Sequence, residues 1–438
     1  MRLTIFVSIV VVTTFISIRL FTDEALNPKA AVLIQKSQAQ QESQEKAPEL
    51  ENNAFMQLIA LHYAGDDAYQ QATTFYAQHT KDQQNEFILG KQPSLNKFLE
   101  SSVYLPTLKQ IREPLKYCSQ LIRSCMEHIN QNKQFVTKVL NLINNTLTSY
   151  LAISDYENFD YIEFSWSYHG GFDREIQDAV ILQIYYLIED NQLVLAADSL
   201  FKLIKLNRKF IESAPMSSPA FNAYGHFSTS YPTLIRMLIL KGFNDWSRFD
   251  PYLKPLPISI VTSQSHFEEL FKDMVMPLVK FNEEAIDKTT HFALSKPNAT
   301  INRVYELMEQ FKINENATKA ELIGEFARIN KLEKEVNKRL EGSELILFQL
   351  ANFDNMLGVT FALQAAQKAF GYQGDELIDT DLVILLTAML IESQRYSIEQ
   401  VILKPKFKNP YTSKQAFIKD GQLCFNNSKK DVCIKALE

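Results

Sequence analysis

The chain has 438 residues, of which 46% are hydrophobic, including 30 Phe and 18 Tyr. This apolar content excludes disorder throughout, because it supplies enough buried surface to offset the chain entropy of folding. The length favours two packed lobes over a single core. The formal charge of -6 and a pI near 5.8 give no general attraction to phosphates, so no nucleic-acid partner is expected.

An apolar run opens the chain, from Leu3 to Phe21, with Arg19 as the one charge within it. Its length of roughly 18 to 19 residues is close to the ~20 that cross a bilayer, and Arg19 can snorkel to the interface. A cleaved signal peptide is the alternative, but the small residues of a cleavage site do not follow the run. We therefore expect residues 1–22 to be an uncleaved transmembrane signal-anchor. Arg2 on the leading side places the rest of the chain outside.

Residues 23–53 are expected to form a flexible polar tether. From Gln35 to Asn53 the chain is rich in Gln and Glu, and Leu50 is its only large apolar residue. Such a segment has too little apolar surface to build a core. The folded part is expected to begin at Ala54.

Helical signals dominate after the tether, because Gly totals only 12 and apolar residues recur at three-four spacing. We predict a mainly α protein, a multi-helix bundle or irregular helical-hairpin array in two lobes, 54–250 and 251–438. The clearest pair of helices spans 173–213, with a turn at 189–191 and with Ala196 and Ala197 allowing close approach. Further helices are expected at 264–289, 300–312, 318–340, 344–370 and 380–395.

Three capping boxes mark helix starts, since a hydroxyl and a later Glu or Gln can satisfy two amides reciprocally. They are Ser265 with Glu268, Thr318 with Glu321, and Ser397 with Gln400. Two stretches rich in Pro, Ser and aromatic residues, 214–232 and 251–262, interrupt the helical pattern. The lobe boundary is expected there.

The four cysteines, in a chain expected to be exported, predict two disulfides with three possible connectivities. Sequence-local pairs are the simplest, namely Cys118 with Cys125 and Cys424 with Cys433. On one straight helix the first pair would stand about 10 Å apart, so it requires a helix break between its members. The second pair would staple a small C-terminal β-hairpin expected within 416–434. Four buried free thiols are the alternative, and neither spacing resembles a zinc site.

No nucleophile, metal or phosphate motif of useful specificity occurs, so no cofactor and no metal are expected. Possible pocket loops surround Trp166 and His169, beside two glycines, and Tyr224 and His226, in an aromatic-rich stretch. A packed loop between helices is the ordinary explanation for both. Carboxylates gather at 155–160 and could serve acid-base chemistry in a cleft, although a solvated acidic loop is the ordinary explanation.

Several segments together resemble a group of inner-membrane-anchored periplasmic proteins of Gram-negative bacteria whose activity is not known. The matching segments are Asn53-Ala54-Phe55, the Cys118 and Cys125 pair, 141–150, 192–211 and the terminal Asn409-Pro410-Tyr411-Thr412. In such proteins the end of the chain typically reads D-P-[YF]-[TS]-G-x-P, and this chain has Asn for Asp, Ser413 for Gly and Gln-Ala at the Pro position. The terminal motif also resembles the C-terminal segment of secretion pseudopilins. The resemblance implies a single-pass protein of the bacterial inner membrane with its bulk in the periplasm.

These observations favour a membrane-tethered periplasmic interaction or scaffold protein over an enzyme. Its partners are expected to be the inner membrane, through the N-terminal helix, and another envelope protein. One alternative is a cell-envelope hydrolase that uses paired carboxylates between Asp155 and Asp173. Another is an accessory or chaperone protein in secretion, which the terminal motif prompts.

Overall fold

A computed structural model describes residues 24–45, 52–88, 102–112, 123–159, 172–213, 218–261, 296–314, 316–339, 374–427 and 430–437, with Glu268, Phe271, Val275 and Val279. The expected anchor at 1–22 lies outside these residues, as do Cys118, Trp166, His169, Ser265 and the helix expected at 344–370. No helix in the described part of the chain is long and apolar enough to span a membrane.

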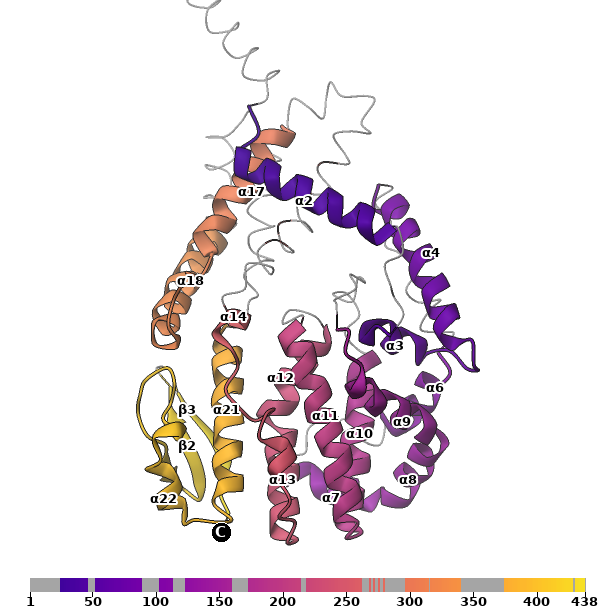
Figure 1. Ribbon diagram of the computed structural model, residues 1–438, viewed down its shortest axis with the longest axis vertical. Coiled ribbons are helices and arrows are strands. Elements are labelled where there is room, and N and C mark those ends of the chain that lie inside the picture. Colours follow the sequence, from indigo (N-terminus) through magenta and orange to yellow (C-terminus); the bar gives the residue numbers. More distant parts are fainter. Residues whose placement is uncertain are drawn as a thin grey trace, which may run out of the picture.

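The protein is mainly α-helical with a small antiparallel sheet at its C-terminal end, as predicted (Figure 1). The helices are α2 (Pro28–Glu45), α3 (Ala54–Ala60), α4 (Ala68–Ile88), α6 (Leu105–Arg112), α7 (Arg123–Gln131), α8 (Lys133–Leu142), α9 (Asn144–Ala152), α10 (Phe172–Glu189), α11 (Leu193–Ser213), α12 (Ser218–Ser228), α13 (Ser230–Leu240), α14 (Ile258–Val261), α17 (Pro297–Phe311), α18 (Lys319–Arg339), α21 (Gly374–Glu392) and α22 (Ile398–Ile402). Short 3-10 turns are η1 (Ile153–Asp155), η3 (Ser247–Phe249) and η5 (Pro405–Phe407).

The predicted helical hairpin at 173–213 is confirmed as α10 and α11. Asn191 has a φ of 60°, the left-handed conformation that a short turn between antiparallel helices requires. Ala196 and Ala197 are fully buried, so the small side chains let α11 approach its neighbours closely. This hairpin forms the centre of the largest apolar cluster, which also contains α3, α8, α9, α12 and α13.

The stretch 214–232 was predicted to be irregular, with Tyr224 and His226 on a loop, and this prediction is wrong. Residues 218–228 form α12, and α13 follows directly after Thr229. Pro219 and Pro232 both lie in the first turn of a helix, where the missing N–H has no intrahelical acceptor to lose. The prolines therefore mark the starts of two helices.

Helix α21 connects two apolar clusters. Its Leu377 and Ile384 join the cluster around α10 and α11, whereas Leu382 and Leu386 join a second cluster made with α18, α22 and the sheet. A helix that is apolar nearly all round is one that is covered on several sides. The lobe boundary placed between residues 250 and 251 stays a prediction.

The range 23–53, predicted to be a flexible tether, contains helix α2. Ala30 and Ile34 are buried in a third cluster with α17, and Asn302 on α17 accepts a hydrogen bond from the Asn27 amide at 2.7 Å. The few apolar residues before Gln35 are enough to hold the start of α2, and they lie just upstream of the polar stretch that suggested a tether. In Figure 1, α2 crosses above the helical body between α17 and α4.

Both capping boxes within the described residues are confirmed. The Thr318 amide donates to Glu321 at 2.7 Å, and the Glu321 amide donates back to the Thr318 hydroxyl at 3.4 Å. Ser397 and Gln400 make the same reciprocal pair at the start of α22. These contacts fix where α18 and α22 begin.

The C-terminal sheet has three strands in the order β1 (Phe417–Lys419), β2 (Gln422–Asn426) and β3 (Asp431–Lys435). The predicted hairpin corresponds to β2 and β3, and β1 is an addition that the sequence did not indicate. Asp420 and Gly421 both have positive φ, as the two-residue turn between β1 and β2 requires. Cys424 lies directly opposite Cys433 in the register, and the two form the predicted disulfide.

Hydrogen bonds on either side of this pair explain why a disulfide fits there. The Ala436 amide donates to the Gly421 carbonyl, and the Asn427 amide donates to the Lys430 carbonyl. Hydrogen-bonded and non-hydrogen-bonded residue pairs alternate along antiparallel strands. Counting from these two hydrogen-bonded pairs, residues 424 and 433 form a non-hydrogen-bonded pair. The Cα atoms of such pairs approach closely, here to 4.1 Å.

We expect the disulfide to stabilise the C-terminal sheet by about 2–3 kcal/mol, the value for closing a short loop. Non-reducing peptide mapping should find Cys424 joined to Cys433, and the C424A/C433A variant should unfold at a lower urea concentration than the parent. Full alkylation of both thiols in the unreduced protein would contradict this assignment.

Candidate functional site

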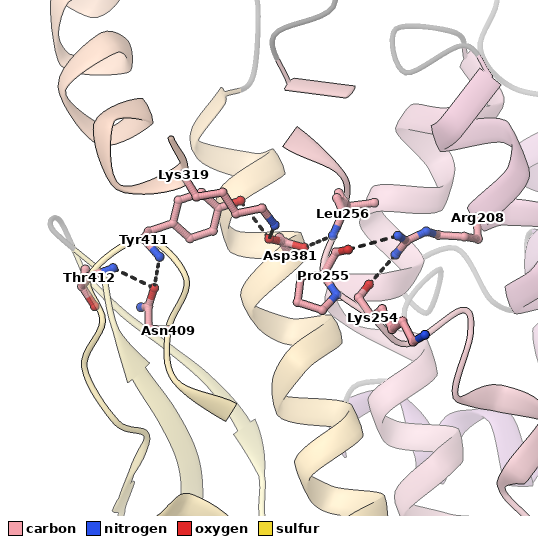
Figure 2. Close-up of polar contacts among 9 residues, drawn as sticks. All are labelled: Arg208, Lys254, Pro255, Leu256, Lys319, Asp381, Asn409, Tyr411 and Thr412. Atoms are coloured by element: carbon pink, nitrogen blue, oxygen red, sulfur yellow. Dashed lines mark hydrogen bonds and ion pairs between the residues drawn. The ribbon is translucent and has the colours of Figure 1, made fainter. Parts of the chain in front are cut away.

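The carboxylate of Asp381 on α21 connects three segments of the chain that are far apart in sequence (Figure 2). Its side chain is fully buried. One carboxylate oxygen accepts from the Leu256 amide. The other accepts from Lys319 Nζ at 2.7 Å and from the Tyr411 hydroxyl at 2.9 Å. Three donors from three separate segments therefore satisfy one charge.

Local structure brings each donor to Asp381. Lys319 is the first residue of α18, directly after the Thr318 cap. Tyr411 stands in a tight loop in which Asn409 Oδ1 accepts from the amides of Tyr411 and Thr412 at 2.8 and 3.2 Å. The ammonium of Lys319 also lies 5.5 Å from the centre of the Tyr411 ring. The terminal motif that resembles the pseudopilin segment thus makes an internal contact.

A second cation holds the segment that supplies the Leu256 amide. Arg208 on α11 donates to the Lys254 carbonyl at 2.6 Å and to the Pro255 carbonyl at 3.3 Å (Figure 2). These contacts join the centre of the helical hairpin to the segment that crosses over to α21. We call Asp381, Lys319, Tyr411 and Leu256 the Asp381 centre.

A second buried polar group lies between α10, α11, α12 and α13. Asn207 donates to Gln177 Oε1 at 3.2 Å and to the Tyr231 hydroxyl. His226 Nε2 stands 3.7 Å from Asp178 Oδ1, outside hydrogen-bond range. All are buried except the partly exposed Asp178. This group fixes how four helices meet, and only Asp178 at its edge reaches the protein surface.

Burial controls the charge of two histidines. His226 has its pKa lowered to about 3 by burial, with a smaller contribution from the positive charge of Arg174. His62 has its pKa lowered to about 3 by burial alone, and its Nε2 lies 3.0 Å from the Tyr104 hydroxyl. Both histidines are therefore neutral at physiological pH. Of the four residues predicted to line pocket loops, Tyr224 and His226 are buried core residues of α12, and Trp166 and His169 lie outside the described residues.

The carboxylates predicted as hydrolase candidates are only partly described. Asp155 is exposed and forms an ion pair with Lys205 at 2.9 Å, which holds its pKa below the usual value through that hydrogen bond. Lys209 donates to the Ser154 and Tyr156 carbonyls beside it. Asp160 lies outside the described residues. In the described part of this segment, Lys205 and Lys209 from α11 hold the loop in place through an ion pair and hydrogen bonds.

No cluster of three metal-ligating side chains occurs within the described residues. A hollow of about 600 Å³ lies against one face of α4, where it is lined by Asp67, Gln70, Gln71, Thr74, Phe75 and Gln78. A single carboxylate among amides supplies no acid-base pair. The hollow therefore suggests no reaction.

Exposed apolar side chains gather at one end of the helical body. Val194 and Leu195 begin α11 and are 76% and 52% exposed, and Leu240 ends α13 and is 55% exposed. Both helix ends lie at the bottom of Figure 1. Phe135 on α8 is 44% exposed, and Lys133 at the start of the same helix pairs with Asp190 in the turn between α10 and α11. We call Phe135, Val194, Leu195 and Leu240 the apolar end.

Comparison of the chain with protein-family models, curated proteins and solved structures finds no match.

Replacing Asp381 by Asn should destabilise the protein by about 3–5 kcal/mol. The neutral amide cannot compensate the charge of Lys319, and its NH2 group would face groups that are themselves hydrogen-bond donors. Urea unfolding measures this change. The matched control is E306Q, which breaks the exposed pair between Arg303 and Glu306. That variant should cost at most about 1 kcal/mol. Equal unfolding midpoints for the two variants would refute the structural importance of the Asp381 centre.

Stability should fall as the pH drops below about 6.5, where unfolded histidine gains a proton that buried His62 and His226 do not accept until about pH 3. Between about pH 7.5 and 5, each histidine contributes a loss of about 2 kcal/mol. H226Q should therefore remove about half of the histidine-dependent loss in urea unfolding. H128Q, at an exposed position on α7, is the control. An unchanged pH slope in H226Q would contradict the assignment.

Proposed function

We propose that this protein is a membrane-tethered interaction or scaffold protein of the bacterial envelope, whose helical body presents the apolar end to a partner protein. The observation that carries the proposal is the grouping of Val194, Leu195 and Leu240 on two adjacent helix ends. Large apolar side chains that cluster on a surface favour burial against another molecule, whereas single exposed ones need no explanation.

The surroundings of the apolar end support recognition of a folded partner. Leu193 and Met237, next to the exposed residues, pack against the main cluster, so the surface rests on a rigid base. Asp198 pairs with both Lys202 and Arg248 one turn further along α11. Charged groups around an apolar centre are the arrangement found at protein interfaces.

The membrane part of the proposal rests on the sequence. The run from Leu3 to Phe21 has the length and composition of a signal-anchor, and the resemblance to anchored periplasmic proteins agrees with it. The Cys424–Cys433 disulfide is compatible with an oxidising compartment such as the periplasm. These arguments support a helical body outside the inner membrane, within reach of other envelope proteins.

Photo-crosslinking in cells tests the proposal. A benzoylphenylalanine placed at Leu195 or Leu240 should give a discrete adduct with one envelope protein. The same probe at Lys334, an exposed position on α18, is the matched control and should give none. The V194D variant should weaken the adduct formed from Leu195, because a carboxylate in the interface would be desolvated. Adducts of equal strength from all three positions, or none from any, would refute a specific interface at the apolar end.

Fractionation tests the membrane part separately. The full chain should remain with membranes after an alkaline wash, and a chain lacking residues 1–22 should not. Release of the full chain by the wash would refute the anchor without bearing on the interface.

A further inference from the structure

The last part of the chain is basic, although the whole protein carries a formal charge of -6. Residues 395–438 contain nine Lys and Arg against four Asp and Glu, and eight of the nine cations are lysines. The core positions of this segment are taken by apolar residues such as Phe407 and Leu423. The described lysines of this segment are exposed or half-buried around the sheet and α22.

Two of these lysines share a single acidic partner. Lys404 lies 2.6 Å from Glu392 at the end of α21, and Lys406 lies 3.4 Å from the same carboxylate. The ammonium of Lys404 also stands 3.4 Å from the centre of the Tyr396 ring. One negative charge compensates two positive ones, so this part of the surface keeps a net positive charge.

Two more lysines lie beside them without an ion pair in the described part of the chain. The Asn409 amide donates to the Lys414 carbonyl at 2.9 Å, so the tight loop of 409–414 brings Lys414 next to Lys408. Both side chains are exposed. Phe407 points into the core between Lys406 and Lys408, which leaves the lysines on either side of it at the surface.

Apolar groups stand among these cations. Leu403, next to Lys404, is 64% exposed, and Tyr396 is 47% exposed. We call Tyr396, Leu403, Lys404, Lys406, Lys408 and Lys414 the lysine face. It combines a local excess of positive charge with a leucine and a tyrosine that can enter an apolar layer.

We propose that the lysine face binds the surface of a membrane that contains anionic lipids. A polybasic surface gains Coulomb energy at such a membrane, and an exposed Leu and Tyr add burial below the headgroups. The choice between lipid and protein follows from the kind of cation. Arginine, whose planar fork pairs with carboxylates, is enriched at protein interfaces, whereas lysine is depleted there and acts as a compact point charge. The lysine face contains four lysines, and the exposed Arg395 beside Tyr396 is the one arginine of residues 395–438.

This inference goes beyond the proposed function, because it assigns a second membrane contact that does not involve the apolar end. In Figure 1, α2 lies at the top of the protein and α22 lies near the bottom. The start of the described chain and the lysine face are therefore far apart. An anchor before residue 24 and a lipid surface at the lysine face would engage the protein at opposite ends.

Flotation with lipid vesicles tests the proposal. The full chain is first reconstituted in phosphatidylcholine nanodiscs, so that the apolar N-terminal run is already in lipid. It is then mixed with vesicles of phosphatidylcholine alone or with phosphatidylglycerol added. Binding should require phosphatidylglycerol and should weaken as salt is raised, because exposed charges are screened. K406Q/K408Q/K414Q should lower the affinity about a hundredfold, since each lysine near an anionic surface contributes roughly fivefold.

A matched variant keeps the test specific. K241Q/K331Q/K334Q removes the same total charge from exposed positions on other elements and should bind as the parent does. L403S, which changes no charge, should weaken binding by an amount that salt does not alter. Equal losses in the two triple variants would overturn the lysine face as the site. If the parent binds polyglutamate but does not bind phosphatidylglycerol vesicles, the proposal of a lipid ligand is wrong and an acidic protein is the ligand instead.

Discussion

The structure depends on the neutralisation of one buried carboxylate. An uncompensated charge in a protein interior is so costly that a buried carboxylate such as Asp381 requires several donors around it. Its donors come from residues 256, 319 and 411, which are far apart in sequence. The start of α18, the loop before β1 and the segment after η3 are therefore ordered together on α21. Loss of any one donor would weaken the position of the other two.

This dependence explains the role of the C-terminal unit. Its strands are only three to five residues long, and a three-stranded sheet of that length is marginal by itself. It is held by the disulfide within the sheet, by Leu423 and Phe425 packed against α21, and by Tyr411 at the Asp381 centre. Arg236 on α13 also donates to the Ala436 carbonyl at 3.0 Å. The disulfide thus joins two strands within the sheet, and apolar and polar contacts hold the sheet to the helices.

The sequence predicted the features that local rules control. Periodicity identified α10 and α11, two capping boxes located helix starts, and the cysteine spacing gave the pair on β2 and β3. The prediction was wrong where a residue type is common both in loops and at helix starts. Pro219 and Pro232 suggested a loop, but they lie in the first turns of α12 and α13. The Asp381 centre had one detectable signal, the two acids Asp379 and Asp381 within the apolar stretch 377–390, which imply buried and paired charges. Its partners could not be predicted, because long-range packing alone brings Lys319 and Tyr411 to it.

The exposed apolar side chains and the exposed lysines lie on different elements of the protein. The apolar end belongs to α8, α11 and α13, whereas the lysine face belongs to the segment that follows α21. Core packing does not explain either surface, because both are built from side chains that point away from the buried clusters. The Asp381 centre lies between the elements that carry them and fixes their relative position. A rigid link between two dissimilar surfaces is what the proposed role, bringing two binding partners together, would require.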